Sequence, residues 1–306
     1  MAELITIILS ILILISIGFI SKRVGLLEKA HTLILNNIII YLTMPALIFR
    51  AVFESRISLS LLKIPLVALA IAALSMGVAY IVGRFLHLKR PTFGAFLLVA
   101  AIGNTGYLGY PLTLQLFGIG NLVKAVFYDL SGTVVFTFTI GLLVAQRYGQ
   151  GNGKVNIIKE VFTFPPLIGL LVALVVKGLG IGLPNFLTDT IGFLAGATIP
   201  LVMLTIGLSL ELTEVRTYAL AIAVVVLIKL VVAPIVAMLG GNILGMSGSD
   251  LGIMVLEASM PSFLLSLVVG LRYGLDTDFL PAAIVVTTML SMITIPVWQY
   301  LLKAIS

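Results

Sequence analysis

The chain has 306 residues, of which 60% are hydrophobic and only 10% are charged. A soluble domain is about one-quarter charged, so this composition excludes an ordinary soluble protein and indicates one integral membrane domain over residues 1–306. The net charge of +6 does not point to nucleic acid, because the basic residues cluster in short loops beside apolar segments, where they act as topology signals. The absence of cysteine excludes disulfides, thiolate nucleophiles and cysteine-based metal sites.

Ten apolar segments are long enough to cross a membrane, for which about 20 residues are needed. The first lacks the basic n-region and cleavage site of a secretory signal peptide, so we expect it to remain as a helix. The predicted segments are 3–21, 32–51, 61–86, 93–117, 121–146, 157–179, 185–209, 216–241, 250–271 and 277–303.

The orientation follows from the lysines and arginines of the loops. Loops that follow odd-numbered segments hold eleven of the 18 basic residues, the opposite face holds six, and Lys229 lies inside a segment. The richer face is expected to be cytoplasmic, which puts both termini outside the cell membrane. The Gly-rich connection over residues 149–156 is then a flexible cytoplasmic loop.

That loop divides the chain into two halves in which Pro and Gly recur in register. Pro45 and Pro200 are 155 positions apart, and Gly118 and Gly274 are 156 apart. Each half has five segments, so the second half must insert upside down. The sequence therefore predicts an all-α fold of ten transmembrane helices in two inverted repeats, over about 1–148 and 157–306.

Two of the predicted helices, the fourth and the ninth, are broken at their centres. An interrupted helix survives at membrane depth where it is buried in protein or lines a cavity, and transporters bind their substrates at such places. If the two breaks cross, each second half-helix points its N-terminus at the crossing, which suits a carboxylate. The predicted substrate-binding residues at the breaks are Asn104, Thr105, Gly106, Ser259, Met260 and Pro261.

Glu257 lies one turn before the second break. A charge inside a membrane costs about 2.5 kcal/mol or more, so such a residue is a functional candidate. Together with unwound carbonyls and hydroxyls it suits a hard cation. A sodium site at Glu257, Met260 and Asn104 is therefore predicted, with a proton as the alternative coupling ion and no other cofactor. The structural alternative is a carboxyl group that only bonds to unwound backbone.

Two further ionisable residues lie within predicted segments. Asp129, with Thr133 one turn on, is a second candidate for cation coupling because the fifth helix should pack beside the fourth. Lys229 is a candidate for attracting an anionic substrate. The alternatives are a buried ion pair between Asp129 and Lys229, and a lysine that serves only as a counter-ion.

Three stretches resemble a known family: GNTGYLGYPL (103–112), LEASMPS (256–262) and NNIIIYLTMPALIF (36–49). With the ten-segment repeat, they make the chain similar to prokaryotic members of the auxin efflux carrier family, which are related to PIN-type auxin carriers and to malate and malonate carriers. The resemblance implies a fold like that of bile-acid/sodium symporters. Segments 1, 2, 6 and 7 would form a scaffold, and segments 3–5 and 8–10 would form a core that moves like an elevator. A homodimer would form through the scaffold segments.

The same resemblance bears on the site. Glu257 resembles the carboxylate that binds sodium in bile-acid symporters, and the two breaks match the family's helix crossover. The central loop is short, unlike the long regulatory loop of plant PINs, so auxin itself is not the expected substrate.

The sequence thus predicts a secondary active transporter of a small organic anion, coupled to a cation. The alternative within the carriers is a sodium/proton antiporter without an organic substrate. An intramembrane enzyme is not expected, because paired intramembrane aspartates, HExxH and GxSxG are absent. A channel is not expected either, because it would have symmetric pore-lining repeats with filter loops. An ATP-driven pump is not expected, because the chain has no Walker loop.

Overall fold

The computed structural model describes residues 2–28, 30–151, 157–210 and 215–305. Within these ranges the chain is helical, and its one extended pairing is an isolated antiparallel bridge between Gly103 and Ser262. Residues 152–156, most of the predicted cytoplasmic loop, lie outside the described residues. The chain is therefore an all-α protein in its described part.

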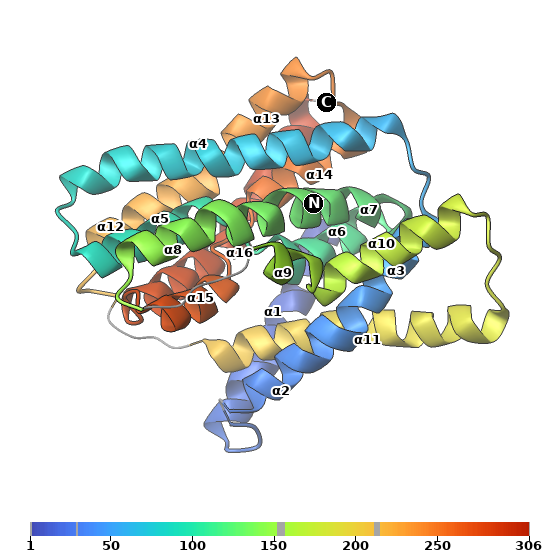
Figure 1. Cartoon of the computed structure of the whole chain (residues 1–306), viewed down its shortest axis with the longest axis horizontal. Coiled ribbons are helices and arrows are strands. Elements are labelled where there is room, and N and C mark those ends of the chain that lie inside the picture. Colours follow the sequence, from blue (N-terminus) through green and yellow to red (C-terminus); the bar gives the residue numbers. More distant parts are fainter. Residues whose placement is uncertain (1, 29, 152–156, 211–214, 306) are drawn as a thin grey trace. The chain divides into compact units, whose positions relative to one another are not determined.

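The helices follow one another with short connections (Figure 1). Several of them are interrupted by π-helical turns, which are numbered η in the text. The first half has α1 (Ala2–Arg23), α2 (His31–Ile38), η1 (Ile39–Thr43), α3 (Met44–Glu54), α4 (Lys63–Phe85), α5 (Arg90–Ala101), η3 (Thr105–Gly109), α6 (Tyr110–Phe117), α7 (Ile119–Tyr128), η4 (Asp129–Val134), η5 (Thr137–Gly141) and α8 (Leu142–Tyr148), with a short 3₁₀ helix η2 (Leu59–Leu62) before α4. The second half has α9 (Ile157–Phe162), α10 (Pro165–Gly178), α11 (Asn185–Ser209), α12 (Ala219–Leu227), η6 (Ile228–Val232), α13 (Ala233–Ile243), α14 (Gly248–Ala258), α15 (Leu265–Tyr273) and α16 (Phe279–Ile305).

Seven helical stretches among the described residues are long and apolar enough to cross a membrane. They coincide with seven of the ten predicted segments, so the integral membrane character is confirmed. The other three predicted segments consist of shorter helices: α5 with α6, α9 with α10, and α14 with α15. The stretches are Ile5–Arg23, His31–Glu54, Lys63–Phe85, Ile119–Tyr148, Asn185–Ser209, Ala219–Ile243 and Phe279–Leu302.

The chain folds as two compact units. The first comprises Met1–Ser58, Tyr110–Val126 and Ile158–Leu210. The second comprises Leu59–Gly109, Phe127–Ile157 and Glu211–Ser306.

In the first unit, glycines let helices approach closely. A side chain at Gly18 of α1 would overlap the backbone of Leu204 in α11, and one at Gly207 would overlap the carbonyl of Ile15. Gly169 of α10 lies in the same way on Pro45 of α3, beside which α10 runs in Figure 1. Small residues give membrane helices the van der Waals contact that holds them together.

Two lysines of this unit cap two helices in equivalent ways. Lys22 Nζ donates to the carbonyls of Leu208 and Leu210, at 2.9 and 2.7 Å, where α11 ends. Lys177 Nζ donates to the carbonyls of Phe53 and Ser55, at 2.6 and 2.5 Å, where α3 ends. Both lysines thus satisfy last-turn carbonyls that have no partner within their helix.

Each of these positions has its equivalent 155 residues later or earlier: Lys22 matches Lys177, and Leu208 and Leu210 match Phe53 and Ser55. Thr198 Oγ1 also donates to the carbonyl of Thr43, the residue 155 positions before it, at 2.9 Å. Pro45 and Pro200 have the same spacing of 155 residues.

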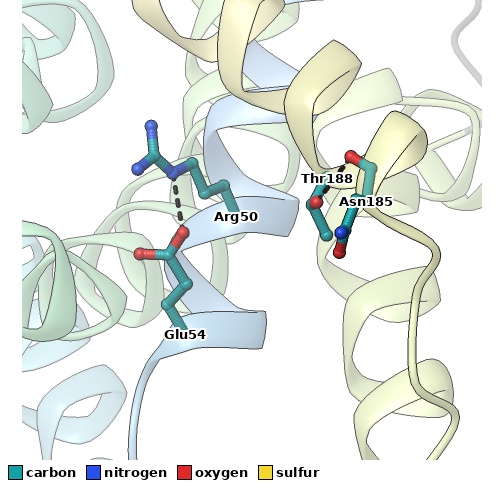
Figure 2. A network of polar contacts seen from close by, with 4 residues as sticks. All are labelled: Arg50, Glu54, Asn185 and Thr188. Atoms are coloured by element: carbon teal, nitrogen blue, oxygen red, sulfur yellow. Dashed lines mark hydrogen bonds and ion pairs between the residues drawn. The ribbon is translucent and has the colours of Figure 1, made fainter.

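An exposed ion pair also lies on α3. Arg50 Nε donates to Glu54 Oε1 at 2.8 Å, one turn apart, and Figure 2 shows this pair with Asn185 and Thr188 at the start of α11. Both charged side chains are about 40% exposed, so the pair contributes little to stability.

In the second unit, Asp276 joins three segments. Its Oδ2 accepts hydrogen bonds from Thr92 Oγ1 of α5 (2.5 Å) and from the hydroxyl of Tyr218 (3.1 Å), and its Oδ1 accepts from the amides of Asp278 and Phe279 at the start of α16. Partial burial raises the pKa of Asp276, but these hydrogen bonds outweigh it, so the pKa lies below its ordinary value. The charged carboxylate therefore fixes the unit where α5, α12 and α16 begin.

Candidate functional site

The two interrupted helices of the second unit meet backbone to backbone. The amide of Asn104 donates to the carbonyl of Pro261 (2.7 Å), and the amide of Phe263 donates to the carbonyl of Ile102 (3.1 Å), on either side of the Gly103–Ser262 bridge. Unwound backbone buried at membrane depth must find partners, and here each break supplies them to the other. Both interruptions that the sequence predicted are present.

Side chains complete this pairing. Ser262 Oγ donates to the carbonyl of Val99 at 2.7 Å, and the Ser262 amide donates to Thr287 Oγ1 of α16 at 3.2 Å. Sequence reasoning missed both residues. Ser262 follows Pro261 directly and could have been found from the break itself, whereas Thr287 is one of three threonines in α16 and carries no such signal.

Beyond the first break, the chain re-enters a helix at once. The carbonyl of Asn104 accepts the amides of Leu108 (3.1 Å) and Gly109 (3.3 Å), which starts η3. The first amides of this half-helix therefore have no partner within it. Asn104 is buried and its Oδ1 accepts no hydrogen bond, so this oxygen can accept a hydrogen bond or bind a cation at the start of η3.

Asp129 lies against the start of η3. Its Oδ1 accepts from Thr105 Oγ1 at 2.5 Å, and its carboxylate packs on Gly106, where an added Cβ would stand 3.1 Å from Oδ2. Asp129 is 4% exposed and begins η4. The structure thus brings Asp129 together with Thr105 and Gly106, as the expected packing of the fifth helix on the fourth requires.

Glu257 reaches the other end of η3. The side chain is fully buried, and its carboxylate packs so tightly on Gly109 that a Cβ at that residue would overlap it. Sequence reasoning noted Gly109 only as a helix breaker and not as the residue that seats a carboxylate.

Lys229 reaches the crossing from η6. It is 2% exposed, and its Nζ lies 2.8 Å from where a Cβ on Gly103 would be. The carbonyl oxygen of Met260 lies 3.6 Å from the same point. A side chain at residue 103 would displace the ammonium group from its place beside the paired backbone.

The other predicted site residues make hydrogen bonds within their own segments. Ser259 Oγ donates to the carbonyl of Leu256 at 2.7 Å and so closes the end of α14. Thr133 is buried, and its carbonyl accepts from Thr137 Oγ1 in the same helical segment, so its described bond does not reach the crossing. Met260 is fully buried and its amide donates to the carbonyl of Glu257 at 3.3 Å.

Comparison with known proteins bears on the identity. The model of the family described as membrane transport protein matches residues 3–299. The chain belongs to this family, the auxin efflux carrier family. Its relatives are transporters and not enzymes, so this auxin efflux carrier family protein is a membrane transporter.

Three relatives of this family member can be compared in detail. An uncharacterised transporter of Methanocaldococcus jannaschii is 34% identical over 304 residues, which covers 97% of this chain and 98% of the relative. A putative malonate transporter of Rhizobium meliloti is 26% identical over 313 residues, or 99% and 97% of the two chains. An auxin efflux carrier component of Arabidopsis thaliana is 23% identical over 145 residues, 45% of this chain and 23% of the plant protein.

Proposed function

We propose that this transporter is a secondary active carrier of a small organic anion, with the helix crossing of the second unit as its site. The observation that carries the proposal is the paired backbone at Gly103 and Ser262, with Lys229, Glu257 and Asp129 buried around it. Buried charges are costly in a membrane and are typical of substrate and ion pathways. The site's residues belong to one unit, so that unit can carry them as a body.

The substrate part of the proposal rests on Lys229 and on Asn104. The ammonium group beside Gly103 supplies a positive charge, and the amides that follow Asn104 supply the dipole end of a half-helix. A carboxylate satisfies both at once. The relative from Rhizobium meliloti bears the name of a malonate transporter, so a short dicarboxylate is the first substrate to test.

The coupling part rests on Glu257. Sodium prefers oxygen ligands, and the Glu257 carboxylate, the carbonyl of Met260 and Asn104 Oδ1 are the oxygens predicted from sequence. Asn104 Oδ1 fits that role because it is buried without a hydrogen bond. The described residues hold no cluster of three or more His, Asp or Glu, which does not count against sodium, since carbonyl and amide oxygens serve it. A proton on Glu257 would serve the same coupling role.

Asp129 offers a second place for a cation, at Thr105 and Gly106. Two buried carboxylates in one unit are also the feature that favours the alternative function, a sodium/proton antiporter without an organic substrate. Under that function sodium would exchange for protons with no dicarboxylate present.

The mechanism we propose is an elevator. The first unit contains the predicted scaffold segments 1, 2, 6 and 7, together with Tyr110–Val126, and the second contains most of the predicted core. The hydrogen bonds of Lys22 and Lys177 support the inverted repeat that such a mechanism needs, because they recur 155 positions apart. A homodimer through the scaffold helices belongs to the same proposal.

Uptake into proteoliposomes tests the function. Labelled malonate should accumulate under an inward sodium or proton gradient, and Lys229→Met should abolish uptake, because an apolar side chain of similar length cannot attract the anion. Lys89→Met, which removes the same charge from an exposed position, is the matched control. If sodium flux is driven by a proton gradient and does not change when organic anions are added, the protein is instead a sodium/proton antiporter.

The proposed location is the cell membrane, with both termini outside. The chain has no cysteine, so single introduced cysteines report orientation cleanly. Gln150→Cys, at an exposed residue of the central loop, should react with an impermeant maleimide only after the cells are opened. Gly182→Cys, at an exposed glycine with open space around it on the opposite face, should react in intact cells, and the reverse pattern would invert the topology.

A further inference from the structure

The second unit has a pocket away from the helix crossing, between the end of α4 and the start of α5. It is open to the surface and has a volume of about 290 Å³. The residues that line it include Tyr80, Arg84, His87, Arg90, Phe93 and Tyr148.

The charge of this pocket is of one sign. Arg84, His87 and Arg90 line it, and none of its described lining residues is acidic. Arg84 is held over the ring of Tyr80, 5.9 Å from the ring centre, and Arg90 Nη2 donates to the carbonyl of Arg147. Two guanidinium groups fixed at one cavity are suited to a phosphate, because their N–H groups match its oxygens in pairs.

The backbone at His87 is a second feature of this pocket. His87 has φ of 50°, and it is the one non-glycine residue in the described ranges with positive φ. A histidine in this left-handed conformation costs free energy that a glycine would not. The imidazole lies on the pocket wall just after α4 ends, in spite of that cost.

The floor of the pocket is aromatic. The ring of Phe93 packs edge-on against Tyr80 (centroids 5.8 Å apart) and Tyr148 (5.1 Å). Gly83 makes this possible, since a Cβ there would lie 2.8 Å from the Phe93 ring. Tyrosines with an apolar body and a polar tip concentrate where a membrane meets water.

α4 also carries exposed apolar side chains, on a face other than the one that lines the pocket. Leu74, Ile81 and Phe85 are 54%, 61% and 76% exposed, and their spacing of seven and four residues places them on one face of the helix. A helix with exposed apolar side chains and a cationic aromatic pocket at its end matches a lipid, with acyl chains along the helix and a headgroup in the pocket.

We propose that this pocket binds the phosphate of an anionic phospholipid headgroup at the membrane interface. The proposal does not depend on the transported substrate. Loop arginines that only set topology need no shaped cavity, whereas here two arginines and a strained histidine converge on an aromatic floor. Basic pockets at the ends of membrane helices are suited to such headgroups.

Lipid binding to the purified, full-length protein tests this. Phosphatidylglycerol and phosphatidylcholine are titrated in a neutral detergent, with retention followed by native mass spectrometry and stability by thermal unfolding. The wild type should prefer phosphatidylglycerol, and Arg84→Gln with Arg90→Gln should lower its affinity at least tenfold. The matched control, Lys89→Gln with Arg147→Gln, removes two charges from the same region outside the pocket and should bind as the wild type does.

The outcomes separate the sources of the phosphate. If inorganic phosphate alone stabilises the wild type and phosphatidylglycerol does not, the lipid assignment is overturned in favour of a free phosphate. The proposed site would be overturned if both double variants lost affinity for phosphatidylglycerol equally. It would also be overturned if the wild type bound phosphatidylglycerol no better than phosphatidylcholine. Should the arginine variant fail to fold, His87→Gly decides: it relieves the backbone and should still weaken phosphatidylglycerol binding at least threefold, and unchanged binding would refute the proposal.

Discussion

Gly109→Ala is the sharpest single test of the helix crossing. The added Cβ would overlap the Glu257 carboxylate, and that carboxylate is fully buried, so either η3 or the Glu257 side chain must move. Either movement displaces the group that we propose couples transport to a cation.

The change in the free energy of unfolding depends on two opposing contributions. Alanine in place of a helical glycine stabilises by about 0.5–1 kcal/mol through backbone entropy. Overpacking in a tight core costs about 1–3 kcal/mol. At Gly77 of α4 nothing lies within 4 Å, so only the first contribution acts and Gly77→Ala should be neutral or stabilising. At Gly106 the Cβ would stand 3.1 Å from Asp129, so Gly106→Ala should fall between the other two.

Two measurements on the three variants test this reasoning. Thermal unfolding in detergent should rank Gly77→Ala highest, Gly106→Ala next and Gly109→Ala lowest. The dependence of malonate uptake on sodium or pH should be lost in Gly109→Ala and kept in Gly77→Ala. If Gly109→Ala is as stable and as ion-dependent as Gly77→Ala, Glu257 does not rest on Gly109 in the working protein and the proposed coupling geometry is wrong.

Three further predictions concern the crossing and the repeat. Glu257→Gln should insert and fold but lose ion dependence, seen as loss of sodium-induced thermal stabilisation, and wild-type sodium and pH dependence would make Glu257 structural. Asn104→Ala should weaken malonate binding in a thermal-shift titration more than Ser259→Ala does, because the Ser259 hydroxyl bonds to its own helix; the opposite order would move the anion to α14. Lys22→Met and Lys177→Met should each destabilise the protein by about 1–2 kcal/mol, because each leaves two helix-end carbonyls without their donor, and clearly unequal shifts in melting temperature would count against the repeat.

Much of this architecture was predictable because a membrane restricts what a sequence can do. Backbone in hydrocarbon must bond within its own helix, so a Gly–Asn–Thr–Gly run inside an apolar segment has few explanations other than a buried break. That is why the breaks after Ala101 and Ala258 could be placed from residue types alone, and why Glu257, Asp129 and Lys229 stood out among apolar neighbours. The breaks lie where they were expected.

The contacts across the breaks were beyond the same reasoning. Gly103 and Gly109 look alike in sequence, yet one makes room for an ammonium group and the other for a carboxylate. Which group each glycine faces depends on how α14 packs on η3 and how η6 packs beside the end of α5. The periodicity of hydrophobic residues carries no information on how these helices are rotated. Ser259 was predicted as a ligand from its position at the break, and that position did not reveal that its hydroxyl bonds to the end of α14.

In the proposed repeat, the helix-capping lysines occur in both halves, whereas the buried charged residues of the crossing do not. Lys22 and Lys177 occupy equivalent positions and make equivalent bonds. Glu257, in contrast, falls 156 positions after Ala101, Asp129 falls 156 before Val285, and Lys229 falls 156 after Ala73. Two inverted halves alone would present the same pair of helix ends to either side of the membrane. Charges contributed once each make the crossing asymmetric, with the two carboxylates on different halves and one ammonium group between the breaks. A site that must distinguish an anion from its coupling cation needs that asymmetry, because each ion requires surroundings of opposite sign.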